Sequence, residues 1–302
     1  GDGLNNLCEC ENCMKDHPTD LYIRMVNELS ERLFKINPKM KLGYIAYANI
    51  IMPPLKESVK NSHNNVIFVF APITRCNTHP INDSKCVAPE CLRFWPDINK
   101  IDFSCLEWME KNISSNMGCY ELTAHILEEL TFLLGYETLC MKIYDEPGLI
   151  DAVLEKIGTF YLRHTEILCG YKCVPFIWAS DDMGFKTSTL VSPDFLRKKI
   201  FPWHKKCADI AHKYGKAYLL HACGNLESVM DDLIDFVKVD SKHSFEDTIM
   251  EVTRAYELYH KRISIIGGID VDFLCRNDEK TIRERVKKTL DICMPKGGYC
   301  LG

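Results

Sequence analysis

One histidine and two cysteines have the spacing of metal ligands. His221 and Cys223 stand at the end of an apolar run that predicts a strand, and Cys300 stands on a later predicted strand. Alternate residues of a strand point to the same side, so His221 and Cys223 can face one ion. With Cys300 they would offer one imidazole and two thiolates, which suits Zn2+ with a fourth position open for substrate. The same spacing also fits a core histidine beside two buried thiols.

Carboxylates and a further histidine follow other predicted strands. Asp181 and Asp182 come directly after one of them, where they can orient a ligand or position a proton, or only cap a helix or complete a turn. His243 can contact substrate, support a metal ligand from behind, or cap the next helix. Asp270 follows a Gly-Gly pair, whose missing side chains would let a ligand approach the backbone. We predict catalytic roles for these four residues.

The elements that would position these side chains alternate between strand and helix. Buried apolar runs predict strands, and apolar residues at helical spacing predict helices. Expected strands are 41–49, 65–72, 174–180, 217–221, 236–240, 263–269 and 299–302. Expected helices are 20–36, 118–134, 147–169, 226–234, 245–259 and 281–293, and another starts at Ser192 and Pro193, an N-cap followed by a first-turn proline. The histidines in helical segments are expected to be structural or surface residues: His125, His164, His204 and His212.

This alternation predicts an α/β fold with a parallel sheet. Two expected strands precede a loop at 74–96 that contains cysteine and proline, and five follow it. A strand before Gly1 would make eight, so we predict a (β/α)8 TIM-type barrel in incomplete or hybrid form. The carboxyl ends of barrel strands form the active-site face, and the candidate residues sit at such ends. This shared position favours a functional interpretation.

The composition argues against several classes of protein. The chain has 302 residues, 46% of them hydrophobic and 26% charged, with a net charge of -5 and a pI of about 6.1. It has no basic excess for a nucleic acid or an anionic membrane, and its longest apolar runs are too short to span a bilayer. Sixteen cysteines scattered through core-like segments favour reduced thiols in the cytoplasm over disulfides. The sequence predicts no oligomeric state.

Three blocks near the carboxyl terminus resemble a known family. The blocks are His221-Ala222-Cys223-Gly224-Asn225, Gly267-Gly268-Ile269-Asp270 and Gly297-Gly298-Tyr299. With their spacer helices they are similar to the signature blocks of the uroporphyrinogen decarboxylase superfamily, and the resemblance covers about residues 98–302. His-x-Cys with a distant cysteine resembles the branch of methylcobamide:thiol methyltransferases, of the coenzyme M type.

This resemblance implies a fold, an activity and ligands. His221, Cys223 and Cys300 would bind zinc, the zinc would activate a small thiol, and the methyl group would come from a methylated corrinoid on a partner protein. Cys300 stands inside the Gly-Gly-Tyr turn, whereas the family's last cysteine can lie a few residues beyond it, so a ligand past Gly302 is the alternative. The arginines and aspartate that a porphyrinogen decarboxylase needs are not found before Ile98, which makes decarboxylation the weaker alternative.

Residues 1–90 resemble a different family. Asp2-Gly3, the C-x-C-x-x-C motif at 8–13, Gly43–Tyr47 and Phe70–Ile73 are similar to a bacterial domain of unknown function found in carbohydrate-processing proteins. The thiol motif can bind a metal, but a local thiol-rich loop, or a disulfide in an exported protein, is the favoured interpretation. A carbohydrate-binding or glycosidase-like protein is therefore a further alternative, with Asp2 and Glu121 as the visible carboxylates. We predict two domains of different ancestry, 1–90 and 98–302, joined by a natural fusion or by gene assembly.

Overall fold

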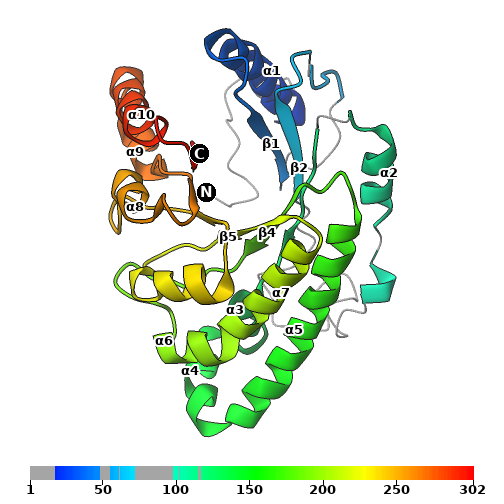
Figure 1. Cartoon of the computed structure of the whole chain (residues 1–302), viewed down its shortest axis with the longest axis vertical. Coiled ribbons are helices and arrows are strands. Elements are labelled where there is room, and N and C mark those ends of the chain that lie inside the picture. Colours follow the sequence, from blue (N-terminus) through cyan, green and yellow to red (C-terminus); the bar gives the residue numbers. More distant parts are fainter. Residues whose placement is uncertain (1–17, 48–54, 61, 72–97, 102, 115–116) are drawn as a thin grey trace. The chain divides into compact units, whose positions relative to one another are not determined.

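The computed structural model describes residues 18–47, 55–60, 62–71, 98–101, 103–114 and 117–302 (Figure 1). They belong to two units. Unit 1 comprises Gly1–Glu121 with Tyr171–Pro175, and unit 2 comprises Leu122–Gly170 with Phe176–Gly302. Within the described ranges, no helix is long and apolar enough to cross a membrane.

Unit 1 contains a helix packed on a pair of parallel strands. Ile23 and Val26 lie one turn apart on the helix and are buried together with Val66. The buried Asp20 carboxylate accepts the backbone N–H groups of residues 55–57 at 2.9–3.3 Å, which ties the helix to that segment. The expected helix and both expected strands are confirmed, as α1 (Pro18–Ile36), β1 (Leu42–Tyr47) and β2 (Val66–Ala71). Unit 1 also contains η4 (Ile98–Lys100) and α2 (Ser104–Asn112).

Unit 2 is built on a six-stranded parallel sheet in which chain order equals spatial order. The strands are β3 (Leu122–Thr123), β4 (Phe176–Ser180), β5 (Ala217–His221), β6 (Ser241–His243), β7 (Ser264–Ile266) and β8 (Tyr299–Cys300). Because every neighbouring pair is parallel, the carboxyl ends of all six strands lie at one edge. That edge carries the candidate site.

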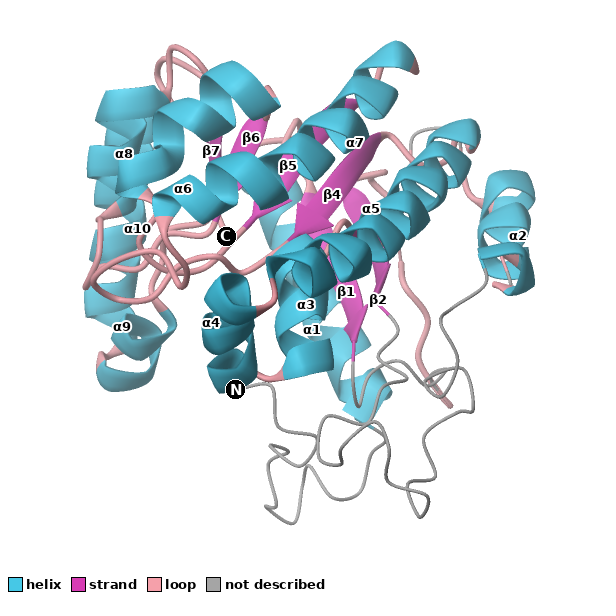
Figure 2. Cartoon of the chain, turned by 90° about the horizontal axis from the view of Figure 1, so that it is seen from below, coloured by secondary structure: helices cyan, strands magenta, loops and turns pink. Residues whose placement is uncertain are grey.

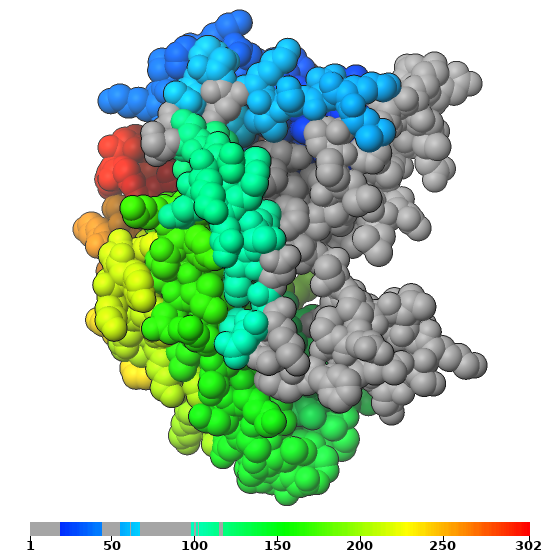
Figure 3. Space-filling model, turned by 90° about the vertical axis from the view of Figure 1, so that its right-hand side faces the viewer, coloured from blue at the N-terminus to red at the C-terminus, as the bar shows by residue number. Residues whose placement is uncertain are grey.

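Helices connect consecutive strands of unit 2. They are α3 (Ile126–Leu134), α4 (Tyr136–Asp145), α5 (Pro147–Gly170), α6 (Pro193–Phe195), η5 (Leu196–Ile200), α7 (Phe201–Lys213), η6 (Glu227–Val229), η7 (Asp232–Val237), α8 (Val252–Tyr259), α9 (Val271–Arg276) and α10 (Glu279–Cys293). Helices α5 and α7 pack against each other and against β4 and β5 (Figure 2). Gly158 on α5 permits this close approach, because a Cβ there would come within 2.2 Å of the Trp203 ring. On the face drawn in Figure 3, green residues of unit 2, which include those of α5, form a continuous surface.

The alternation of side chains decides which residues face the helices. Ile177 on β4 and Leu220 on β5 are fully buried, and each such side chain contributes about 1.5–3 kcal/mol to folding. Side chains one residue further along point to the opposite side of the sheet. Trp178 and His221 are on that side, and the register pairs His221 with His243 on the neighbouring strand. The two histidines therefore share the face away from the helices.

Several boundaries differ from those expected from the sequence. The helix expected at 118–134 begins only at Ile126, because Leu122 and Thr123 pair with β4 as the short strand β3. The strand expected at 236–240 is wrong: π-helical η7 continues to Val237, Lys238 ends it in a left-handed conformation, and β6 starts at Ser241. The expected helix 245–259 begins at Val252.

The expected strand 263–269 ends at Ile266. The two glycines that follow have φ angles of +99° and +106°, which an extended strand does not adopt.

The α/β class and the TIM-type alternation of strand and helix are confirmed. Eight strands occur in the described residues, six in unit 2 and two in unit 1. Two of them, β3 and β6, lie at residues where the sequence predicted no strand. Among the described residues, β3 and β8 are the edge strands of the unit 2 sheet.

Candidate metal centre

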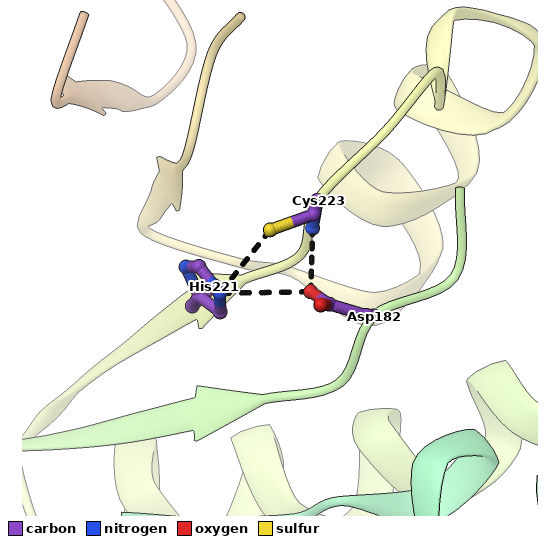
Figure 4. Close-up of side chains that lie close together, drawn as sticks. All are labelled: Asp182, His221 and Cys223. Carbon is purple, nitrogen blue, oxygen red and sulfur yellow. Dashed lines mark hydrogen bonds and ion pairs between the residues drawn. The ribbon is translucent and has the colours of Figure 1, made fainter. Parts of the chain in front are cut away.

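Three side chains at the carboxyl edge of the unit 2 sheet point toward one another (Figure 4). They belong to Asp182, His221 and Cys223, and one ligand atom of each lies within 4.8 Å of the others. His221 Nε2 is 3.6 Å from the Cys223 Sγ and 3.5 Å from Asp182 Oδ1. All three residues are half-buried, so an ion between them would be partly shielded from water and still accessible to a ligand.

The distances match the dimensions of a zinc site. A Zn–S bond of about 2.3 Å and a Zn–N bond of about 2.0–2.1 Å, at a tetrahedral angle, place sulfur and nitrogen about 3.5 Å apart. The observed separation is 3.6 Å between the Cys223 Sγ and His221 Nε2. A Zn–O bond of about 2.0–2.2 Å places nitrogen and oxygen about 3.4 Å apart, against an observed 3.5 Å. His221 Nε2 therefore has the spacing of a zinc ligand relative to both the sulfur and the oxygen, and all three atoms are of donor types that zinc accepts.

Two glycines bring Asp182 to the other two side chains. Gly224 has a φ of +80°, and a Cβ on it would come within 2.2 Å of the Gly184 backbone. The Gly184 N–H donates to the Cys223 carbonyl at 3.1 Å, and the Cys223 N–H donates to Asp182 Oδ1 at 2.7 Å. The turn after β4 therefore lies directly against the turn after β5, which no larger residue at either position would allow.

The end of β6 holds the His-Ala-Cys segment from the other side. The Ala222 N–H donates to the His243 carbonyl at 2.7 Å, and the buried Lys242 ammonium donates to the carbonyls of Ala222 and Ser244 at 2.8 and 2.9 Å. Burial lowers the pKa of Lys242 to about 8. Ser244 Oγ is 3.7 Å from the Cys223 Sγ. The ligand-bearing segment is thus fixed by its neighbouring strand as well as by β5.

The two histidines of β5 and β6 are in direct contact. Their Nδ1 atoms are 2.6 Å apart, and their ring centroids are 4.9 Å apart. One Nδ1 must carry the shared proton and the other must accept it. Burial, together with the neighbouring His221, lowers the pKa of His243 to about 3, so His243 is neutral at physiological pH. Sequence analysis gave His243 several possible roles, and the structure places it directly behind a candidate ligand.

The Cys223 thiol is held in its protonated form when no metal is bound. Burial and the negative charge of Asp182 raise its pKa to about 11. Thiolate is the form that binds metal, so an incoming cation would have to displace the proton. The arrangement is consequently able to bind a divalent cation with release of one thiol proton, and it is a weak nucleophile without one.

Asp181, the neighbour of Asp182, is used differently. Its side chain is fully buried, and it accepts the N–H groups of Leu127 and Glu128 at 3.0 and 2.8 Å. It also bonds His204 Nε2 at 2.8 Å, and His204 Nδ1 in turn lies 2.8 Å from the Tyr218 hydroxyl. Asp181 therefore caps the first turn of α3, which is the structural alternative that its sequence position left open.

The structure does not bring Asp270 or Cys300 to the three side chains. Asp270 is the N-cap of α9, accepting the Asp272 N–H at 2.8 Å, and it also accepts the Asp247 N–H at 3.0 Å. Cys300 is exposed on β8, which β6 and β7 separate from β5, and its thiol is 3.8 Å from the Leu301 carbonyl. Asp182 occupies the place among the ligand atoms that the sequence analysis gave to Cys300.

The Gly-Gly pair before Asp270 does not offer an open backbone. A Cβ on Gly267 would come within 2.8 Å of the His243 ring, and one on Gly268 within 2.3 Å of Val252. The missing side chains make room for these two residues. The interpretation of the pair as a ligand approach is therefore corrected.

Some residues at this edge were not singled out from the sequence. Lys242 is one of them. Its position directly before the candidate residue His243 is the feature of the sequence that could have indicated it. His125, which was expected to be a structural or surface residue inside a helix, precedes α3 at the end of β3, and its Nδ1 lies 2.8 Å from Glu128 Oε2. Burial raises the pKa of Glu128 despite its bond to His125. Asp2 and the thiol motif at 8–13 lie outside the described residues, and Glu121 lies in unit 1.

Comparisons with known proteins identify the family of the chain and a similar fold. The family model of uroporphyrinogen decarboxylase (URO-D) matches residues 128–302, more than half of the chain, and a domain of unknown function (DUF4838) matches residues 2–134. A solved structure of a methyltransferase from Methanosarcina mazei has a similar fold, with a TM-score of 0.52 at 14% identity. The match covers 65% of this chain and 55% of that one, so this chain spans just over half of its length. No curated protein matches the sequence significantly.

Proposed function

Since the chain belongs to the uroporphyrinogen decarboxylase family, we propose that it is a zinc-dependent methyltransferase. It would move a methyl group from a methylated corrinoid, carried by a partner protein, to a small thiol. The observation that carries the proposal is the convergence of His221 Nε2, the Cys223 Sγ and Asp182 Oδ1 at zinc-ligand spacing. The likeness of fold to a methyltransferase supports the same class of reaction.

The metal would do one thing that the side chains cannot do alone. Bound zinc would hold an incoming thiol as a thiolate at neutral pH, ready to attack a methyl group. His221 and Cys223 would hold the ion, and Asp182 would complete the three protein ligands. A catalytic zinc site of three protein ligands keeps a fourth position for substrate. Cys300, or a residue beyond Gly302, is the third ligand implied by the family resemblance, and we propose Asp182 in its place.

The remaining residues of the edge would orient this set. Lys242 donates hydrogen bonds to the carbonyls of Ala222 and Ser244. Gly184 and Gly224 allow the turn that contains Asp182 to pack against the turn that contains Cys223. Asp181 would act at a distance by fixing the start of α3. The corrinoid would supply the methyl group and accept the electron pair of the broken bond, and its partner protein and the thiol are proposed from the family resemblance.

Zinc content tests the proposal. We expect about one zinc per chain in the wild type and less than a tenth of that in Cys223→Ser and His221→Ala. Cys275→Ser is the matched control, because Cys275 is an exposed free thiol on α9 outside the three-residue group. Elemental analysis after dialysis against a weak chelator measures all four proteins. Equal zinc in the wild type and in Cys223→Ser would contradict the proposal.

The reaction itself is tested with zinc-loaded protein. We expect the visible spectrum of methylcobalamin to change on addition of a small thiol and protein, and not with Cys223→Ser. Zinc-loaded protein that transfers no methyl group but releases carbon dioxide from a porphyrinogen would instead identify the decarboxylase branch of the family.

A further inference from the structure

The two ring nitrogens of His221 have separate surroundings. Nε2 faces the Cys223 Sγ at 3.6 Å and Asp182 Oδ1 at 3.5 Å. Nδ1 faces His243 Nδ1 at 2.6 Å. The 2.6 Å between the two Nδ1 atoms is a short hydrogen bond, whereas 3.5 Å between Nε2 and the Asp182 carboxylate is too long for a good one. The histidine pair therefore controls where the single ring proton of His221 lies.

Only one placement of that proton leaves His221 able to bind a cation. A neutral imidazole donates through one nitrogen and accepts through the other. If His243 donates, His221 Nδ1 is the acceptor and Nε2 keeps the proton, which blocks a metal. If His221 donates through Nδ1, Nε2 carries no proton, and it lies beside the ligand atoms of Cys223 and Asp182. Metal-binding histidines commonly donate their second N–H to a fixed acceptor in this way.

The His243 ring is fixed where it can accept that proton. Its backbone is paired in β6, and its carbonyl accepts the Ala222 N–H at 2.7 Å. The Trp178 ring lies edge-on to it, with centroids 5.7 Å apart. On another side the ring fills the space left by Gly267, where a Cβ would come within 2.8 Å of its Cδ2. The position of the Nδ1 acceptor on β6 therefore depends on contacts with residues of the neighbouring β5, of β4 and of the turn after β7.

We propose that His243 is a positioning residue that accepts the Nδ1 proton of His221 and so makes Nε2 the metal-binding atom. It would contact neither the ion nor the substrate. This inference rests on the proposed metal site and adds to it a fourth residue, on which the affinity of the site depends through a single hydrogen bond.

Three substitutions at one position separate the hydrogen bond from simple packing. In His243→Asn the side-chain oxygen can stand near the position of Nδ1, so the acceptor is kept. His243→Gln carries the same amide one methylene farther away, and His243→Leu has no acceptor. We expect zinc affinity, measured by competition with a chromophoric chelator, to stay within about threefold of wild type for Asn. It should fall about 10–100-fold for Gln and Leu.

Two outcomes of the affinity measurement would overturn the inference: wild-type affinity in His243→Leu, or an Asn variant as weak as the Leu variant. Thermal unfolding of the metal-free proteins identifies a variant that has lost its fold. Histidine nitrogen NMR of the zinc-loaded wild type gives an answer without any variant. It should show the proton on His221 Nδ1 with a coupling to His243 Nδ1, and a proton on His243 Nδ1 would overturn the inference. A wild type that binds no zinc would instead refute the proposed function.

Discussion

Two stretches of the same sheet edge differ in how their polar residues are used. At the ends of β4, β5 and β6, side chains from three strands contact one another, and three of them have ligand atoms within 4.8 Å. At the ends of β7 and β8, Asp270 caps α9 and Cys300 is exposed. Both stretches carry metal-ligating residue types at strand ends. A strand-end position therefore does not make a site unless neighbouring turns also bring the side chains together.

Asp181 and Asp182 show the same contrast within one dipeptide. The Asp181 side chain is 0% exposed and all its bonds go to α3 and His204, whereas Asp182 is 37% exposed and faces His221. The strand places them on opposite sides, so one stabilises the helical layer and the other is available to a ligand.

The largest difference between the two stretches of the sheet edge is expected for serine substitution of Cys223 and of Cys300. Cys223→Ser should weaken zinc binding by at least about 100-fold, because a thiolate ligand is lost. Cys300→Ser should change it by less than about threefold, since Cys300 lies outside the group. Chelator competition measures both. A large loss for Cys300→Ser would restore the ligand set implied by the family resemblance.

The next largest effect should come from Asp181. Asp181→Asn leaves a buried site with fewer charge-assisted bonds to His204 and to the start of α3. We expect the free energy of unfolding to fall by about 2–4 kcal/mol. Denaturant unfolding measures it. A stable variant with lost zinc binding would show that Asp181 acts at the metal centre instead.

Lys242 predicts a dependence on pH. Its pKa is lowered to about 8 by burial, so between pH 8 and 10 the unfolded chain binds more protons at this residue than the folded chain. By linkage, the wild type should gain stability relative to Lys242→Met as pH rises through this range, on the order of 1–2 kcal/mol. Urea unfolding of both proteins at several pH values measures the difference. A difference that is constant with pH would show that the folded lysine keeps its ordinary pKa.

The smallest effect is expected at Asp270. Asp270→Ala removes an N-cap on a partly exposed helix and should cost about 0.5–2 kcal/mol of stability without changing zinc affinity. Unfolding and chelator competition on the same sample measure both quantities. Loss of zinc from a folded Asp270→Ala protein would extend the site to β7 and remove the contrast between the two stretches.

The sequence predicts part of this architecture because local pattern and tertiary packing agree there. β5 has the bounds expected from its apolar run, and the two-residue spacing of His221 and Cys223 places them together. The Ser192 cap with Pro193 is likewise confirmed, with the Ser192 Oγ accepting the Phe195 N–H at 3.2 Å. In these places each residue's preference and its final environment point the same way.

Other features depend on contacts between segments far apart in the chain. Val237 and Val239 are buried at the end of a helical segment and in the turn after it, and their apolar character was mistaken for a strand. The place of Asp182 depends on Gly184 meeting Gly224, two positions that no local pattern relates. No local pattern in the sequence predicts that Lys242 is buried. Tertiary packing determines the burial of Lys242, the position of Asp182 and the helical end at Val237.

The most direct test of the metal centre is a crystal structure of the zinc-loaded chain with data collected at the zinc absorption edge. We expect an anomalous peak bonded to His221 Nε2 and the Cys223 Sγ, at about 2.0–2.1 and 2.3 Å, with a carboxylate oxygen of Asp182 as the third protein ligand. A zinc peak elsewhere, or none between these side chains in a zinc-containing crystal, would contradict it.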